Sequence, residues 1–179
     1  MMASLFRWGA WGLLLAFACA PGMGAAQPAT AHLATAHPAL TIKTLDGKTF
    51  DLAAERGKWV VVNFWATWCS PCIAEMPAIS KYVAAHTNVA AIGLAYDRSS
   101  RADVMKFAEQ HPVAYPLAQL DMDDLPRGIE MPAALPTTWL IAPDGHVAKR
   151  FTGPIDAKLL DAAIVAPHSP SSGSAGSGS

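Results

Sequence analysis

The chain has 179 residues, of which 52% are hydrophobic and 15% charged, and its net charge is −1. This length and hydrophobic content are sufficient for one domain with a proper core. A chain so close to neutral offers no basic face to collect phosphates, so its composition argues against nucleic-acid binding.

The first 26 residues have the pattern of a secretory signal peptide. Arg7 supplies a positive charge, residues 8–20 form a short apolar run, and small side chains follow at 24–26. The run is shorter than the roughly 20 apolar residues that cross a bilayer comfortably. Retention as an uncleaved anchor and lipid attachment at Cys19 are the alternatives. We therefore expect a periplasmic or otherwise exported protein that meets the membrane only through this segment.

The rest of the chain alternates between strand and helix patterns. A linker is expected over 27–38, hairpins over 39–52 and over 137–142 with 146–151, strands over 58–66 and 89–96, and helices over 70–86, 99–111 and 156–165. The turn dipeptide Asp46-Gly47 marks the first hairpin. The order of elements predicts an α/β domain at 39–166, with helices flanking a central mixed sheet. The Ser/Gly-rich tail, 167–179, is expected to be disordered.

Cys69 and Cys72 are the cysteines that remain if Cys19 leaves with the signal peptide. A disulfide across two residues closes almost no loop, so a purely structural bridge would stabilise little. A helix N-terminus, by contrast, stabilises a thiolate and lowers its pKa. Cys69, at the start of the predicted helix, is therefore the expected nucleophile and the more exposed of the two. Cys72, one turn inside, is expected to resolve the mixed disulfide.

A metal site is the competing explanation for the cysteine pair. Structural zinc takes four ligands, and the histidines of this chain do not cluster with the cysteines in sequence. We expect no bound metal and no cofactor. Copper(I) binding by the two thiolates remains the alternative, with Met76, Met122 and Met131 as candidate thioether ligands.

Two motifs carry a family resemblance. WATWCSPC followed by EMP, and LPTTWLIAPDG nearer the end, resemble the TlpA-like branch of exported thioredoxin-fold proteins, which includes the ResA-type and cytochrome c maturation thiol reductases. The resemblance extends over residues 40–165. It implies a thioredoxin-like fold with an extra N-terminal β-hairpin, and thiol–disulfide oxidoreductase activity of the protein-disulfide reductase type.

The resemblance also implies roles for individual residues. Glu75 lies about one turn after Cys72 on the same helix face, where the family has a glutamate that influences thiol protonation. Pro136 matches the cis-proline that borders the substrate groove. Leu135 and Thr137 flank it, and the groove would bind an extended substrate by strand addition.

One position departs from ordinary thioredoxins, which carry a buried aspartate where this chain has Asn63. A neutral amide cannot accept a proton, so Glu75 becomes the expected proton partner. Trp65 and Trp68 are expected to shield and pack. Trp68 and Pro71, on either side of Cys69, are also expected to contact the substrate.

We expect the protein to be exported and to reduce disulfides in selected protein substrates, for example in cytochrome c or copper-protein maturation. Ser70 and Pro71 place no histidine or lysine between the cysteines to stabilise the thiolate strongly, which favours a reductant over an oxidant. A membrane thiol reductase would then supply electrons. A thiol peroxidase is disfavoured, because no threonine and arginine helpers are recognised around Cys69. Residues 118–134 are expected to set substrate specificity.

Overall fold

The computed structural model describes residues 37–126 and 128–165. The predicted signal peptide, the predicted tail and all but the last two residues of the predicted linker lie outside these ranges. The elements are β1 (Thr41–Lys43), β2 (Thr49–Asp51), the 3-10 helix η1 (Leu52–Glu55), β3 (Trp59–Trp65), α1 (Ser70–Ala85), β4 (Val89–Ala95), α2 (Arg101–Gln110), β5 (Leu117–Gln119), β6 (Thr137–Ile141), β7 (Val147–Thr152) and α3 (Ala157–Val165). The predicted strands and helices are present with small shifts at their ends, and β5 is an additional strand that the sequence pattern did not indicate.

The central sheet is mixed, as predicted, and has the strand order β5-β4-β3-β6-β7. β3 pairs in parallel with β4 and antiparallel with β6. Because β3 is the middle strand, all of its residues are buried. The register pairs Phe64 of β3 with Thr137 of β6. The start of β6 therefore lies beside the end of β3, from which the chain continues toward α1.

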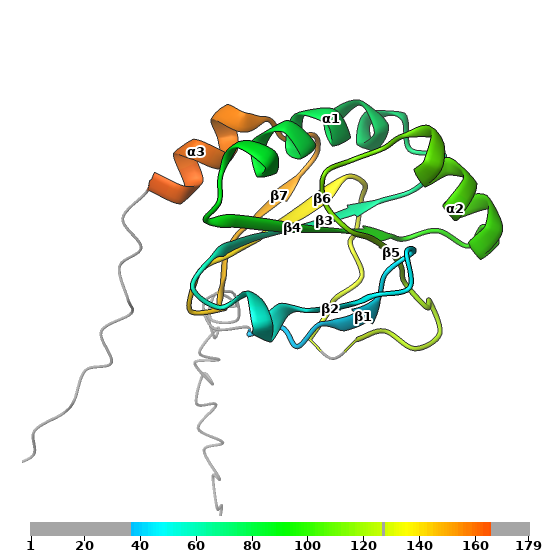
Figure 1. The fold of residues 1–179 in the computed structure, drawn as a ribbon, viewed down its shortest axis with the longest axis horizontal. Coiled ribbons are helices and arrows are strands. Elements are labelled where there is room, and N and C mark those ends of the chain that lie inside the picture. The colour runs from blue at the N-terminus through cyan, green and yellow to red at the C-terminus, as the bar shows by residue number, and fades with distance from the viewer. Residues whose placement is uncertain (1–36, 127, 166–179) are drawn as a thin grey trace, which may run out of the picture.

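Both faces of the sheet are covered, and successive residues of β3 point to opposite cores. Val61 and Trp65 belong to the core under α1, α2 and α3, whereas Val60 and Phe64 belong to the core on the other face. Figure 1 shows the three helices above the sheet and the β1–β2 hairpin below it. None of the helices in the described ranges is long and apolar enough to cross a bilayer.

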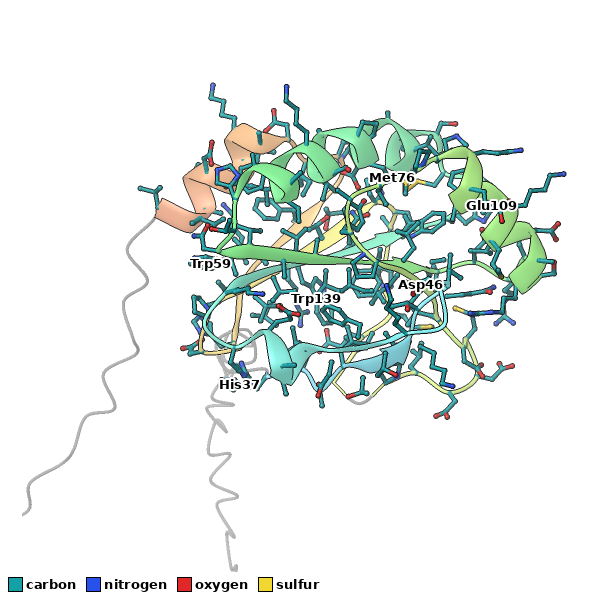
Figure 2. The ribbon with its side chains drawn as sticks, viewed as in Figure 1. His37, Asp46, Trp59, Met76, Glu109 and Trp139 are labelled. Carbon is teal, nitrogen blue, oxygen red and sulfur yellow. A yellow bond between two sulfur atoms is a disulfide. The ribbon has the colours of Figure 1, made fainter. Side chains whose placement is uncertain are left out.

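The N-terminal hairpin forms a separate two-stranded sheet, in which β1 and β2 pair antiparallel. Gly47 has a φ of 84° at the turn, a conformation that glycine adopts without a Cβ clash. The N–H of Leu45 donates to the carbonyl of Leu117 at 2.7 Å, which ties the hairpin to the edge strand β5. The hairpin thus covers a sheet face and part of a sheet edge. In Figure 2, Trp139 lies on this hairpin side of the sheet and Met76 lies between α1 and the opposite face.

Candidate active site

The two cysteines lie where β3 gives way to α1. Cys69 is the N-cap of α1, and its Sγ accepts a hydrogen bond from the N–H of Cys72 at 3.3 Å. The two residues are joined by a disulfide, with their Cα atoms 5.3 Å apart. Pro71 lies in the first turn, where its missing N–H costs no intrahelical hydrogen bond. The strand–helix junction predicted for this motif is therefore present.

The two cysteines differ only slightly in accessibility in this oxidised form. Cys69 keeps 5% of its surface exposed and Cys72 keeps none, so the order is the predicted one although both residues are buried. A reagent or substrate thiol that approaches from solvent reaches Cys69 first. The roles of Cys69 as nucleophile and Cys72 as resolving cysteine stay predictions.

Glu75 is a buried carboxyl one turn after Cys72. Only 3% of its surface is exposed. Its Oε1 accepts a hydrogen bond from Asn63 Nδ2 at 2.7 Å, and its Oε2 accepts one from the backbone N–H of Ile155 at 2.7 Å. Burial raises the pKa of Glu75 above its ordinary value of 4.5, and the hydrogen bonds from Ile155 and Asn63 oppose this rise. A carboxyl with a raised pKa can take up and return a proton near a thiol.

Asn63 is fully buried and positions Glu75 from the central strand. Its Nδ2 also donates to Thr138 Oγ1 at 3.0 Å, while its Oδ1 accepts no hydrogen bond from any described residue. If the side-chain amide of Asn63 flips, its Oδ1 faces Glu75 and can accept a hydrogen bond from the protonated carboxyl. The neutral amide can therefore form a hydrogen bond with Glu75 in either protonation state, whereas an ionised aspartate could bond only the protonated form.

The peptide bond between Leu135 and Pro136 is cis, as the family resemblance implied. The carbonyl of Pro136 accepts a hydrogen bond from the N–H of Gly153 at 2.9 Å. Thr137 is buried and donates through Oγ1 to the carbonyl of Ala134 at 2.7 Å, whereas Leu135 is partly exposed. This loop leads into β6 beside the end of β3, from which the chain continues to the cysteines. The structure therefore brings the predicted substrate-binding residues to the same end of the molecule.

The two tryptophans near the cysteines have different surroundings. Trp65 is fully buried and stacks on Phe107 of α2, as expected of a packing residue. For Trp68 the packing prediction is wrong, because 67% of its surface is exposed. The difference arises because Trp65 ends β3 inside the sheet, whereas Trp68 lies in the loop that leaves it. Trp68 is therefore free to contact another molecule beside Cys69.

Asp97 is a site residue that sequence reasoning missed. Its Oδ2 accepts hydrogen bonds from the N–H and Oγ1 of Thr67, at 2.8 and 2.5 Å, and its Oδ1 accepts from the N–H of Ser99 at 2.9 Å. Burial acts to raise the pKa of Asp97, but the hydrogen bonds from Thr67 and Ser99 together outweigh it and lower the pKa. An ionised Asp97 therefore holds the loop that carries Cys69. Its position just after the apolar residues of β4 was the only signal in the sequence.

The candidate copper ligands are not gathered around the cysteines in one group. Met76 is 1% exposed and packs under α1, while Met122 and Met131 line a surface groove with Trp68. Within residues 37–126 and 128–165, no group of three or more His, Cys, Asp and Glu side chains could hold a metal ion.

Comparison with known proteins assigns the family. Residues 33–150 match the model of the AhpC/TSA family. The thiol–disulfide oxidoreductase ResA of Geobacillus thermodenitrificans is 34% identical over 117 residues, which cover 65% of this chain and 67% of the relative. The chain belongs to the AhpC/TSA family, among the ResA-type thiol–disulfide oxidoreductases. It is thus an enzyme of that class, with protein thiols or disulfides as its substrates.

Solved structures confirm the thioredoxin-like fold. A thiol:disulfide interchange protein of the thioredoxin family from Chlorobium tepidum is 28% identical, with a TM-score of 0.64 over 73% of this chain and 94% of that one. A secreted disulfide oxidoreductase of Mycobacterium tuberculosis, described as homologous to E. coli DsbE, is 26% identical, with a TM-score of 0.57 over 72% of this chain and 96% of that one. The extra N-terminal hairpin predicted for the family is present in this chain as β1 and β2.

Proposed function

We propose that this oxidoreductase is exported and reduces disulfides in selected protein substrates, such as those of cytochrome c or copper-protein maturation. The observation that carries the proposal is the position of Glu75 on α1 one helical turn after Cys72, where its carboxyl is buried and its pKa is raised. This arrangement supplies a nucleophile at a helix N-terminus, a resolving thiol and a proton acceptor for that thiol.

In the proposed reaction, the thiolate of Cys69 attacks one sulfur of the substrate disulfide. A bond forms between that sulfur and Sγ of Cys69, and the second substrate sulfur leaves as a thiolate and takes up a proton. Glu75 accepts the proton of Cys72, whose thiolate then attacks Sγ of Cys69. The bond between Cys69 and the first substrate sulfur breaks, and that sulfur leaves as a thiolate and takes up the second proton. Two electrons have passed to the substrate, and the protein is left as the Cys69–Cys72 disulfide.

The surroundings of the cysteines support the reducing direction. The first turn of α1, Ser70 to Ile73, contains no lysine, arginine or histidine to stabilise a thiolate beyond the effect of the helix N-terminus. Glu75, one turn from Cys72, carries no positive charge, so it adds nothing that would stabilise a Cys72 thiolate and thereby favour the dithiol over the disulfide. A couple with a more stable disulfide is the stronger reductant.

A reductant in an oxidising compartment needs a supply of electrons. A membrane thiol reductase fits this role, because it can carry electrons from the cytoplasmic side to an exported protein. The signal-like composition of residues 1–26 and the secreted relative from Mycobacterium tuberculosis support export. The binding groove would include Trp68, Pro71 and the loop at Leu135–Thr137.

The reduction potential of the Cys69/Cys72 couple tests the direction of electron flow. The protein is equilibrated with graded dithiol buffers and its thiols are then trapped and counted. We expect a value near that of thioredoxin, about −270 mV. A value near about −120 mV, typical of a strong oxidant, would contradict the reducing role and leave the oxidoreductase class unchanged.

Copper handling through the same thiols is the alternative function. Met122 and Met131 line a groove that also contains Trp68, the residue before Cys69, so two thioethers share a groove with the sequence neighbour of one thiol. Anaerobic titration of the reduced protein with copper(I) tests this alternative. Stoichiometric binding that is lost when both cysteines are replaced by serine would support it, and no binding would eliminate it.

A further inference from the structure

A groove on the surface adjoins the active site. It has a volume of about 580 Å³ and is lined by Trp68, residues 96–99, Met122 and Met131. Trp68 and Met131 are the strongly exposed apolar side chains in it, at 67% and 55% of their surfaces. Because Trp68 directly precedes Cys69 in the chain, the groove includes the neighbour of the residue whose sulfur must bond to the substrate.

The walls of the groove are fixed by hydrogen bonds within the protein. The Asp97 carboxylate joins the Thr67–Trp68 loop to Ser99, as described above. Gln119 Nε2 donates to the carbonyl of Ser99 at 2.8 Å and braces the same loop from β5. On the far wall, the Tyr96 hydroxyl donates to the sulfur of Met131 at 3.6 Å. A groove whose walls are already ordered loses little conformational entropy when it binds a ligand.

The chemistry of the lining identifies the kind of ligand. Tryptophan, tyrosine and methionine side chains provide a polarisable apolar surface that adapts to different apolar groups. Arg98 adds a positive charge, and no described residue forms an ion pair or hydrogen bond with its exposed side chain. Asp97 forms no ion pair with Arg98, because its two carboxylate oxygens accept hydrogen bonds from Thr67 and Ser99. An apolar group with a carboxylate beside it complements this surface.

We propose that the groove binds the substrate polypeptide and takes an apolar side chain and an acidic residue that flank the substrate's reactive cysteine. This inference rests on the proposed function and adds a substrate preference to it. The occupant is a substrate because its sulfur has to reach Cys69, which brings the neighbouring residues against Trp68. Met131 and Arg98 are the residues that determine the preference.

Activated disulfides provide a test that does not depend on the natural direction of electron flow. Two peptides each carry one cysteine bonded to thionitrobenzoate, flanked by leucine and aspartate in one and by serine and lysine in the other. Cys69 of the pre-reduced full chain attacks the peptide sulfur and displaces thionitrobenzoate, a good leaving group with a measurable colour. Cys72 then displaces the peptide thiol, so the protein is oxidised to its disulfide and the peptide is reduced. The same reagent without a peptide, 5,5′-dithiobis(2-nitrobenzoate), serves as the reference.

We expect the leucine–aspartate peptide to react on the order of tenfold faster than the serine–lysine peptide, a ratio that corresponds to about 1.4 kcal/mol from partial burial of one apolar side chain and one ion pair. Met131→Ala should reduce this ratio, and Arg98→Glu should shift it toward the lysine peptide. Met105→Ala and Lys106→Glu are matched controls, because both residues are exposed on α2 outside the groove. Each rate is divided by the rate of the same variant with the reference reagent, which removes general losses of reactivity.

Three results would contradict the proposal or its basis, and they are distinguishable. Equal rates for the two peptides with the wild-type protein would overturn the groove as a specificity site and leave the redox function intact. A concentration-dependent dimer that Met131→Ala abolishes, with unchanged peptide ratios, would show that a second copy of the chain occupies the groove instead. Failure to react with the reference reagent as well as the peptides would contradict the oxidoreductase chemistry itself.

Discussion

The carboxylate of Glu75 accepts a hydrogen bond at 2.7 Å from the backbone N–H of Ile155, a residue 80 positions later in the chain. This contact joins the first turns of α1 to the segment that precedes α3. Two residues before Ile155, the N–H of Gly153 donates to the carbonyl of Pro136. The helix that carries the cysteines is thus linked through Glu75 to the cis-proline loop, and the charge of one buried carboxyl bears on both parts of the site.

Replacement of Glu75 by glutamine should change how stability depends on pH. Because the folded protein raises the pKa of Glu75 above 4.5, it holds a proton that the unfolded chain has already released. The free energy of unfolding should therefore fall as pH rises from about 4.5 through the raised pKa, and each unit of the rise corresponds to about 1.4 kcal/mol. Glu75→Gln should lack this decline, measured by urea unfolding at a series of pH values.

Glu109→Gln is the matched control for that measurement, because Glu109 is exposed on α2. It should retain the wild-type pH dependence. If Glu75→Gln declined in parallel with the wild type above pH 4.5, the raised pKa would be contradicted.

The two cysteines should give different products when each is replaced by serine. Cys69→Ser removes the nucleophile and should abolish disulfide exchange. Cys72→Ser leaves the attack intact but removes resolution, so mixed disulfides between Cys69 and substrate proteins should accumulate. Non-reducing electrophoresis of alkylated samples distinguishes the two results. Normal turnover by either variant would contradict these assignments.

Asp97→Asn should loosen the loop that carries Cys69. An amide in place of the carboxylate keeps one acceptor oxygen and loses the charge-assisted hydrogen bonds from Thr67 and Ser99, which should lower the free energy of unfolding by about 1–3 kcal/mol. Exchange at Cys69 should slow at the same time, measured by release of thionitrobenzoate. Asp124→Asn, at an exposed position, is the control and should change neither quantity.

Wild-type stability should also depend on Asp97 at low pH. Since folding lowers the pKa of Asp97 below 3.8, its contribution is present above that pH and is lost as the pH falls through the lowered value. The loss should be absent in Asp97→Asn. A variant that retained the full wild-type stability at neutral pH would show that the three hydrogen bonds of Asp97 contribute little.

Asn63→Asp should lower the free energy of unfolding, and this loss should grow as the pH rises. The substitution places a second carboxyl within 2.7 Å of Glu75 in a buried position, where two like charges cannot both ionise readily. At low pH the pair can share a proton, so the cost should be small. Above neutral pH it should reach on the order of 3 kcal/mol, because a buried charge is left uncompensated. Asn88→Asp, at an exposed position, should show no such trend in urea unfolding.

The sequence by itself determined the parts of this protein that depend on local pattern. The buried strand before Cys69, the helix that starts there, the Asp46-Gly47 hairpin and the alternation of strands and helices all follow from periodicity, turn residues and capping, which act over a few residues. The helical repeat was likewise enough to place Glu75 near Cys72. The cis peptide bond at Pro136 was predicted from the family motif, because an X–Pro bond without such a motif is expected to be trans.

Only the tertiary structure decided how distant segments meet around the cysteines. Asp97 reaches Thr67 because β4 lies beside β3 in parallel, and Glu75 reaches the N–H of Ile155 because the chain returns to α1 after β7. The outward position of Trp68 follows from where β3 ends, and the three-residue strand β5 exists because β4 offers it an edge to pair with. Such contacts depend on sheet order and packing between residues far apart in sequence, which no local pattern records.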